Sequence, residues 1–119
     1  MSLPFAPWRA GGGIVATAGI AALDPQTLTP LFEDFDAQAR WVLDRLDAVL
    51  ADADADRSAL LRLECYLADQ CWFGPWSAAF ADHFAGAEPP ARTTLVVTLP
   101  APGLLVEVQG LCALPQESP

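Results

Sequence analysis

The hydrophobic positions of the chain follow two periods, and the changes between them divide it into predicted elements. The β-branched run over residues 14–18 predicts a strand, and Gly11-Gly12-Gly13 before it predicts a tight turn. Residues 60–67 alternate and predict a second strand, with positions 61, 63, 65 and 67 on its apolar face. Residues 93–99 and 104–114 predict two further strands, joined by a turn at 100–103.

Two segments have the helical period. Thr29 and Pro30 are typical of an N-cap followed by proline at the first helical position, so a helix is predicted to begin there and to run to about Asp52. Gly74 and Pro75 predict the start of a second helix. The apolar stripe of this second helix consists of Trp76, Ala79, Phe80, His83 and Phe84.

The order of these elements favours an α+β fold in a single domain over residues 1–119, with one mixed sheet and two helices on one face. The last two strands are apolar on both faces, over residues 95–97 and 104–108. Because two helices cover only one face of a sheet, the other face needs a different cover. We therefore expect the chain to form an oligomer with copies of itself.

Charge and cysteine content restrict the partners and the compartment. The 119 residues include 15 acidic and 6 basic residues, for a net charge of −9, and all six basic residues are arginine. A negative field repels nucleic acid and acidic membrane surfaces, so neither is an expected partner. The three cysteines, Cys65, Cys71 and Cys112, are an odd number without zinc-site spacing. We therefore predict free thiols in a cytoplasmic protein without a bound metal.

Two charged residues stand where the pattern expects hydrocarbon. Arg92 begins one predicted strand, and Glu107 lies in the middle of the last one. A desolvated charge needs a partner or a ligand. One interpretation is a structural Arg92–Glu107 ion pair, or a strand-edge glutamate that faces water. The other is a site for a small anion, in which Arg92 holds a carboxylate and Glu107 orients or deprotonates water.

Other candidate residues fit structural roles better. His83 is the only histidine and is interpreted as a packing or capping residue. Cys71 lies near a helix start without a basic neighbour that would favour its thiolate. The glycines at 11–13 lack a phosphate-binding context. Asp52, Asp54 and Asp56 match only half of a calcium loop.

The chain resembles the RidA/YjgF family, also called the L-PSP endoribonuclease-like family, over nearly its whole length. The segments that carry the resemblance are Pro90-Ala91-Arg92-Thr93-Thr94-Leu95, Leu99-Pro100 and Leu105-Val106-Glu107-Val108, with weaker matches at Pro4-Phe5, Thr17-Ala18-Gly19-Ile20 and Asp36-Ala37-Gln38-Ala39-Arg40. The separation of fifteen positions between Arg92 and Glu107 is the one found in imine-hydrolysing members.

The resemblance implies a chorismate mutase-like fold and a homotrimer with sites in the clefts between subunits. It also implies a cofactor-free hydrolase, a deaminase that converts 2-imino acids or their enamine tautomers to 2-keto acids and ammonia. These reactive species are released by pyridoxal-phosphate enzymes. In this reading Arg92 binds the substrate carboxylate, Glu107 positions the attacking water, and Gly19 and the Thr94 backbone line the pocket.

The chain departs from the family pattern at three pocket positions. Phe5, Ala18 and Ile20 stand where active members commonly have Tyr, Ser and Gln, whereas Thr93 in place of Ser is a small change. The pocket is therefore expected to be drier. This leaves two main hypotheses. One is a deaminase, with a deaminase of the aminomuconate type and one for a bulkier imino acid as its variants. The other is a non-catalytic binder of small carboxylates. Ribonuclease activity is disfavoured by the charge.

Overall fold

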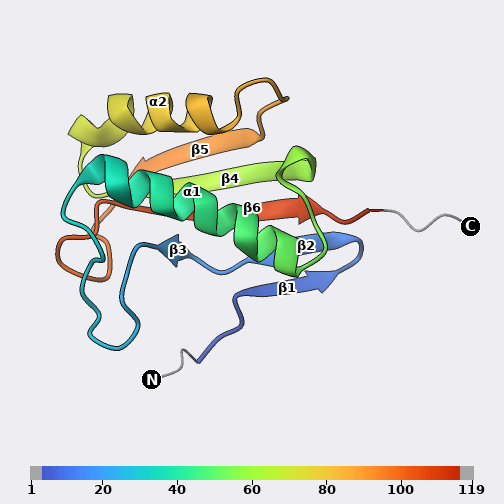
Figure 1. Ribbon diagram of the computed structural model, residues 1–119, viewed down its shortest axis with the longest axis horizontal. Coiled ribbons are helices and arrows are strands. Elements are labelled where there is room, and N and C mark those ends of the chain that lie inside the picture. Colours follow the sequence, from blue (N-terminus) through green and yellow to red (C-terminus); the bar gives the residue numbers. More distant parts are fainter. Residues whose placement is uncertain (1–3, 116–119) are drawn as a thin grey trace, which may run out of the picture.

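The computed structural model describes residues 4–115 and shows one mixed six-stranded sheet with two helices packed on one face (Figure 1). The helices are α1 (Phe35–Asp52) and α2 (Phe73–His83). The short 3-10 turn η1 (Arg57–Ala59) follows α1 and leads into β4, and η2 (Gln70–Trp72) leads into α2. The strands are β1 (Trp8–Gly11), β2 (Ile14–Thr17), β3 (Ile20–Ala21), β4 (Leu60–Leu67), β5 (Ala91–Val96) and β6 (Val106–Ala113). The predicted α+β class is confirmed. No helix within this part of the chain is long and apolar enough to cross a membrane.

Most of the sheet is antiparallel. The strand order is β1-β2-β6-β4-β5, and β3 pairs with β6 beyond the end of β2. Only β4 and β5 run parallel, and α2 is the crossover between them. β5 is therefore an edge strand, with α2 above it (Figure 1).

The predicted start of the first helix is wrong. The helix begins at Phe35, because the Asp34 carboxylate accepts a hydrogen bond from the Ala37 N–H at 2.9 Å and caps it. Pro30 instead forms an isolated bridge with Leu23. The proline signal at residue 30 therefore marks a loop, and the first effective side-chain cap comes four residues later.

The strand predictions are confirmed in outline and corrected in detail. β4 has the predicted bounds, but a bulge between Leu60 and Arg62 turns Leu60 to the helices and leaves Leu61 half-exposed. β5 and β6 are shorter than predicted at 91–96 and 106–113. Short strands β1 and β3 were not predicted. The turn between β1 and β2 is as expected, since Gly12 and Gly13 have φ of +60° and +80°.

The two faces of the sheet have different surroundings. On the helix face, residues such as Leu63, Trp76, Val106 and Val108 are fully buried. We call the other side the open face. It presents exposed apolar side chains from three strands and a polar network from two. The apolar residues are Ile14, Leu95 and Leu111, and the network consists of Glu64, Tyr66 and Gln109. The open face is thus a mixed surface rather than a continuous apolar one.

Candidate functional site

Four of the predicted site residues come together at one hollow. Phe5, Ala18, Gly19 and Ile20 line a cavity of about 680 Å³ between the N-terminal segment, the chain around β3 and one side of α1. The other residues that line it are Pro7, Ala21, Leu23, Asp24, Pro25, Gln26, Leu31, Trp41, Arg45 and Val49. The lining of this hollow is mostly apolar.

Glu107 lies directly beside Gly19. It is in the middle of β6, and its register partner on β3 is Ala21. A Cβ atom placed on Gly19 would be 2.6 Å from Glu107 Oε2, so the absence of a side chain at Gly19 leaves room for the carboxylate. Burial raises the pKa of Glu107, and no side chain within residues 4–115 forms a hydrogen bond or ion pair with it. An unpaired carboxylate with a raised pKa is suited to accept a proton from water.

Gly19→Ala tests this contact. The new methyl group would displace the far end of the Glu107 side chain, so we expect the fold to persist and the function of the carboxylate to be lost. Any activity that depends on Glu107 should fall at least about tenfold, the order expected when a catalytic group is misplaced, with little change in Tm. Gly11→Ala is the matched control, because a Cβ atom there meets nothing within 4 Å. Equal activity in the two variants would show that the Gly19 contact does not position Glu107.

Arg92 lies against α2. Its Nη2 donates a hydrogen bond to Ser77 Oγ at 3.1 Å, and its guanidinium carbon is 4.9 Å from the centre of the Phe80 ring and 5.5 Å from that of Phe73. We call Phe73, Ser77 and Phe80 the Arg92 cradle. Within the described chain, Arg92 has no carboxylate within 4.0 Å. The guanidinium is thus partly desolvated and keeps donors for an anion.

Sequence reasoning missed Phe73 and Ser77. The signal was present, since residues 73, 77 and 80 have the i, i+4, i+7 spacing of one helix face. They were missed because the helix face that meets Arg92 is set by the packing of α2 on β5. The hydrophobic periodicity of the sequence does not determine this packing.

Arg92 and Glu107 lie on opposite faces of the sheet. Tyr66 on β4 is in register with both Glu107 and Leu95, so these three share the open face. Arg92 precedes Leu95 by three positions and therefore points to the helix face, as its contact with Ser77 also shows. A single chain therefore does not form the Arg92–Glu107 ion pair that was one interpretation of the sequence. A site that uses both residues has to take them from two copies.

Thr94 is on the same face as Arg92. Thr94 is in register with Cys65. Two buried polar atoms, Thr94 Oγ1 and Trp76 Nε1, have no hydrogen-bond partner in the described chain. Burial raises the pKa of Cys65 to about 11, so this residue is a neutral thiol in the core. Cys65 and Cys112 are buried as predicted.

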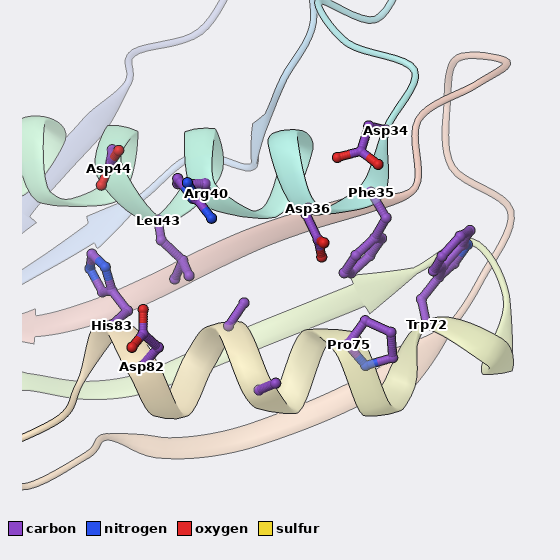
Figure 2. Close-up of a pocket in the computed structure, with 12 residues that line it drawn as sticks. Asp34, Phe35, Asp36, Arg40, Leu43, Asp44, Trp72, Pro75, Asp82 and His83 are labelled. Carbon is purple, nitrogen blue, oxygen red and sulfur yellow. The ribbon is translucent and has the colours of Figure 1, made fainter.

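A second hollow of about 890 Å³ lies between α1 and α2 (Figure 2). It contains none of the residues predicted to bind substrate. Asp36 and Arg40 point into it from α1, and Trp72 stacks on Phe35 at one end with ring centres 4.8 Å apart. His83 lies at the other end.

His83 has the structural role that was predicted. Its Nε2 is 3.2 Å from the Asp47 carboxylate and 3.1 Å from Arg57 Nη1, so it links the end of α2 to α1 and η1. Among residues 4–115 no group of three metal-ligating side chains occurs. Asp56 caps η1 through the Ser58 N–H. Asp69 raises the pKa of Cys71, which favours the thiol form.

Comparison with known proteins gives one consistent result. The sequence profile described as Endoribonuclease L-PSP matches residues 4–114. The chain belongs to the Rid/L-PSP family. A RutC family protein from Synechocystis is 34% identical over 116 residues, which are 94% of this chain and 89% of that protein.

Solved structures of the Rid/L-PSP family have the same fold. A Rid family protein of unknown function from Yersinia pestis has a TM-score of 0.84 and is 28% identical to this chain. The match covers 93% of this chain and 88% of the Yersinia protein chain. RidA from an Antarctic Psychrobacter has a TM-score of 0.83 at 23% identity, over 96% and 91% of the two chains, and shows the fold alone.

Proposed function

We propose that this Rid/L-PSP protein is a reactive imine deaminase, which hydrolyses 2-imino acids or their enamine tautomers to 2-keto acids and ammonia. The observation that carries the proposal is a pair of partly buried charges that have no ion-pair partner within residues 4–115, Arg92 against α2 and Glu107 against Gly19. One binds a carboxylate and the other handles water. Family membership supports the assignment.

The proposed site is completed by a second copy of the chain. Arg92 and Glu107 face opposite sides of one sheet, so in a ring of copies Arg92 of one chain would meet Glu107 of the next. A homotrimer has this head-to-tail geometry. The exposed apolar residues Ile14, Leu95 and Leu111 on the open face would be covered in such an assembly.

The chemistry requires only orientation and one proton acceptor. Arg92 would bind the substrate carboxylate by two parallel hydrogen bonds and so fix the plane of the imine. Glu107 would take a proton from water as the oxygen bonds to the imine carbon. The C=N π electrons move to the nitrogen, which takes the proton from Glu107, so a carbinolamine forms. Glu107 would then carry the hydroxyl proton to the nitrogen, the C–N bond breaks, and ammonia leaves as the C=O of the 2-keto acid forms. These steps use Arg92 as the binding group and Glu107 as the proton carrier.

A non-catalytic carboxylate binder is the second candidate. It is favoured by the apolar residues Phe5, Ala18 and Ile20 in the hollow beside Gly19, which offer no side-chain hydrogen bonds to a reacting molecule. Polynucleotide cleavage is disfavoured by the net charge of −9 without lysine.

Keto-acid release separates the two candidates. 2-Iminobutyrate or 2-iminopropionate would be generated in the cuvette by an amino-acid oxidase, and keto-acid formation followed with and without the protein. We expect acceleration. If the protein does not accelerate keto-acid release from any of several imino acids but binds 2-ketobutyrate measurably, the result supports the carboxylate binder instead.

The pH profile gives a further prediction about Glu107. The carboxylate has to be deprotonated to accept a proton, and burial raises its pKa above the ordinary value of 4.5. Activity is therefore expected to be complete above this raised pKa and to be lost as the pH falls through it. The acidic limb of kcat/KM should lie above pH 4.5 and should be absent from the residual activity of Glu107→Gln. A limb at or below 4.5 would contradict the assignment of Glu107 as the base.

A further inference from the structure

We propose that Ser77 is a positioning residue, which together with the rings of Phe73 and Phe80 sets the direction in which the Arg92 guanidinium presents its donors to the substrate carboxylate. This inference rests on the proposed function, because it gives Arg92 a ligand. It extends the site to α2.

The first support is the arrangement of contacts around the guanidinium. An arginine side chain has several rotatable bonds, and a productive two-bond contact with a carboxylate needs one orientation of its plane. Here Nη2 donates to Ser77 Oγ at 3.1 Å, while the guanidinium carbon is 4.9 Å from the Phe80 ring centre. One polar contact and one ring contact together fix both the tilt and the rotation of the group.

The second support is what each contact leaves available. A hydroxyl oxygen neutralises no charge, and an aromatic face attracts a cation without accepting its N–H groups. The cradle therefore holds Arg92 and leaves most of its N–H donors available, whereas an aspartate in place of Ser77 would neutralise the guanidinium charge. No carboxylate of the described chain comes within 4.0 Å of Arg92.

The third support is the difference between the two rings. Phe80 is buried and belongs to the core, whereas Phe73 is 50% exposed at the first residue of α2. Phe73 is thus the ring of the cradle that is open to solvent, and a bound acid is expected to approach from its side. Its ring limits the directions from which a carboxylate can approach Arg92.

Ser77→Ala tests the inference with little risk to folding, because alanine is the better helix former. We expect KM for a 2-imino acid to rise about fivefold, the size of one hydrogen bond, with kcat nearly unchanged, since Arg92 would hold the carboxylate equally in the ground and transition states. Ser77→Thr, which keeps the hydroxyl, should restore the wild-type KM. In an Arg92→Ala background, Ser77→Ala should have no further effect, which a purely structural serine would not predict.

A spectroscopic readout makes the test independent of turnover. The chain has six arginines and no lysine, so its ¹⁵N–¹H spectrum contains few guanidinium Nε–Hε signals, and Arg92→Ala identifies the one of interest. The Nη2 contact holds the guanidinium in one orientation, so the chemical shift of that signal should differ from those of exposed arginines in wild type and Ser77→Thr. It should move to the chemical shift of exposed arginines in Ser77→Ala, and part of the way in Phe73→Leu.

The outcomes separate this inference from the proposed function. Suppose that Arg92→Ala loses activity, whereas Ser77→Ala has an unchanged KM and an unchanged Arg92 signal. This result would overturn the positioning role of Ser77 and leave the proposed deaminase activity intact. If wild type neither hydrolyses imino acids nor binds 2-ketobutyrate, the function fails. An Nε–Hε signal that is unaltered in Ser77→Ala would then still refute the cradle.

Discussion

Arg92→Ala is expected to lower kcat/KM for a 2-imino acid about 100-fold, because it removes a partly desolvated, hydrogen-bonded partner of the substrate carboxylate. The effect should fall mainly on KM, and 2-ketobutyrate binding should be lost in parallel. Arg92→Lys should recover only part of the affinity, since an ammonium group cannot form the two parallel bonds of a guanidinium. Keto-acid release and calorimetry of 2-ketobutyrate binding measure the two effects.

The control and the contradiction are both well defined. Arg40→Ala removes an arginine that is exposed on α1, away from the proposed cleft, and should leave kcat/KM unchanged. Full activity in Arg92→Ala would remove the basis of the proposed function.

The same variant tests whether the site is shared between copies. Arg92→Ala and Glu107→Gln would each retain only residual activity alone. If they are unfolded and refolded together in equal amounts, random trimers contain interfaces where an intact Arg92 meets an intact Glu107 from another chain, and about a quarter of the wild-type activity should return. No recovery in verified mixed trimers would show that the two residues do not act across one interface.

Gln38→Leu is expected to have the largest effect on stability, about 3 kcal/mol lower free energy of unfolding. Gln38 is fully buried in α1. Its Nε2 donates to the carbonyls of Phe32 and Gly103 at 2.8 and 2.9 Å, and its Oε1 accepts from the Leu105 N–H at 2.9 Å. Leucine has a similar size but leaves all three backbone groups without these partners. Denaturant unfolding measures the difference.

Gln70→Leu is the matched control for this prediction. Gln70 is exposed in η2, and the same substitution there should change stability by less than about 0.5 kcal/mol. If Gln38→Leu were as stable as wild type, the three hydrogen bonds of Gln38 would not be needed to hold the loop before α1 against the loop before β6.

The fold was predictable from the sequence where one residue pattern determined one element. The alternation over 60–67 gave β4 with its correct bounds, and the glycine run gave the turn before β2. The start of α1 was not predictable, because Thr29-Pro30 and Asp34 can both cap a helix. Only the packing of the loop selects Asp34. The faces of β4 were misjudged at Leu61 because a bulge shifts the alternation by one position.

The residues of the candidate site were named from the sequence, whereas their arrangement was not. Phe5, Ala18 and Gly19 line one hollow, and Glu107 lies beside Gly19. That Arg92 and Glu107 face opposite sides follows only from the register of β4 with its two neighbours, which no local pattern contains. The partners of Arg92 on α2 depend on the same crossover.

The opposite orientation of Arg92 and Glu107 has a consequence for how such a protein would respond to its own abundance. In the proposed assembly a single chain carries two half-sites that it cannot join, so activity would be lost as dilution shifts the equilibrium from trimers to single chains. Turnover per chain would then depend on how much protein is made, and the level of synthesis would act as a threshold rather than as a proportional control.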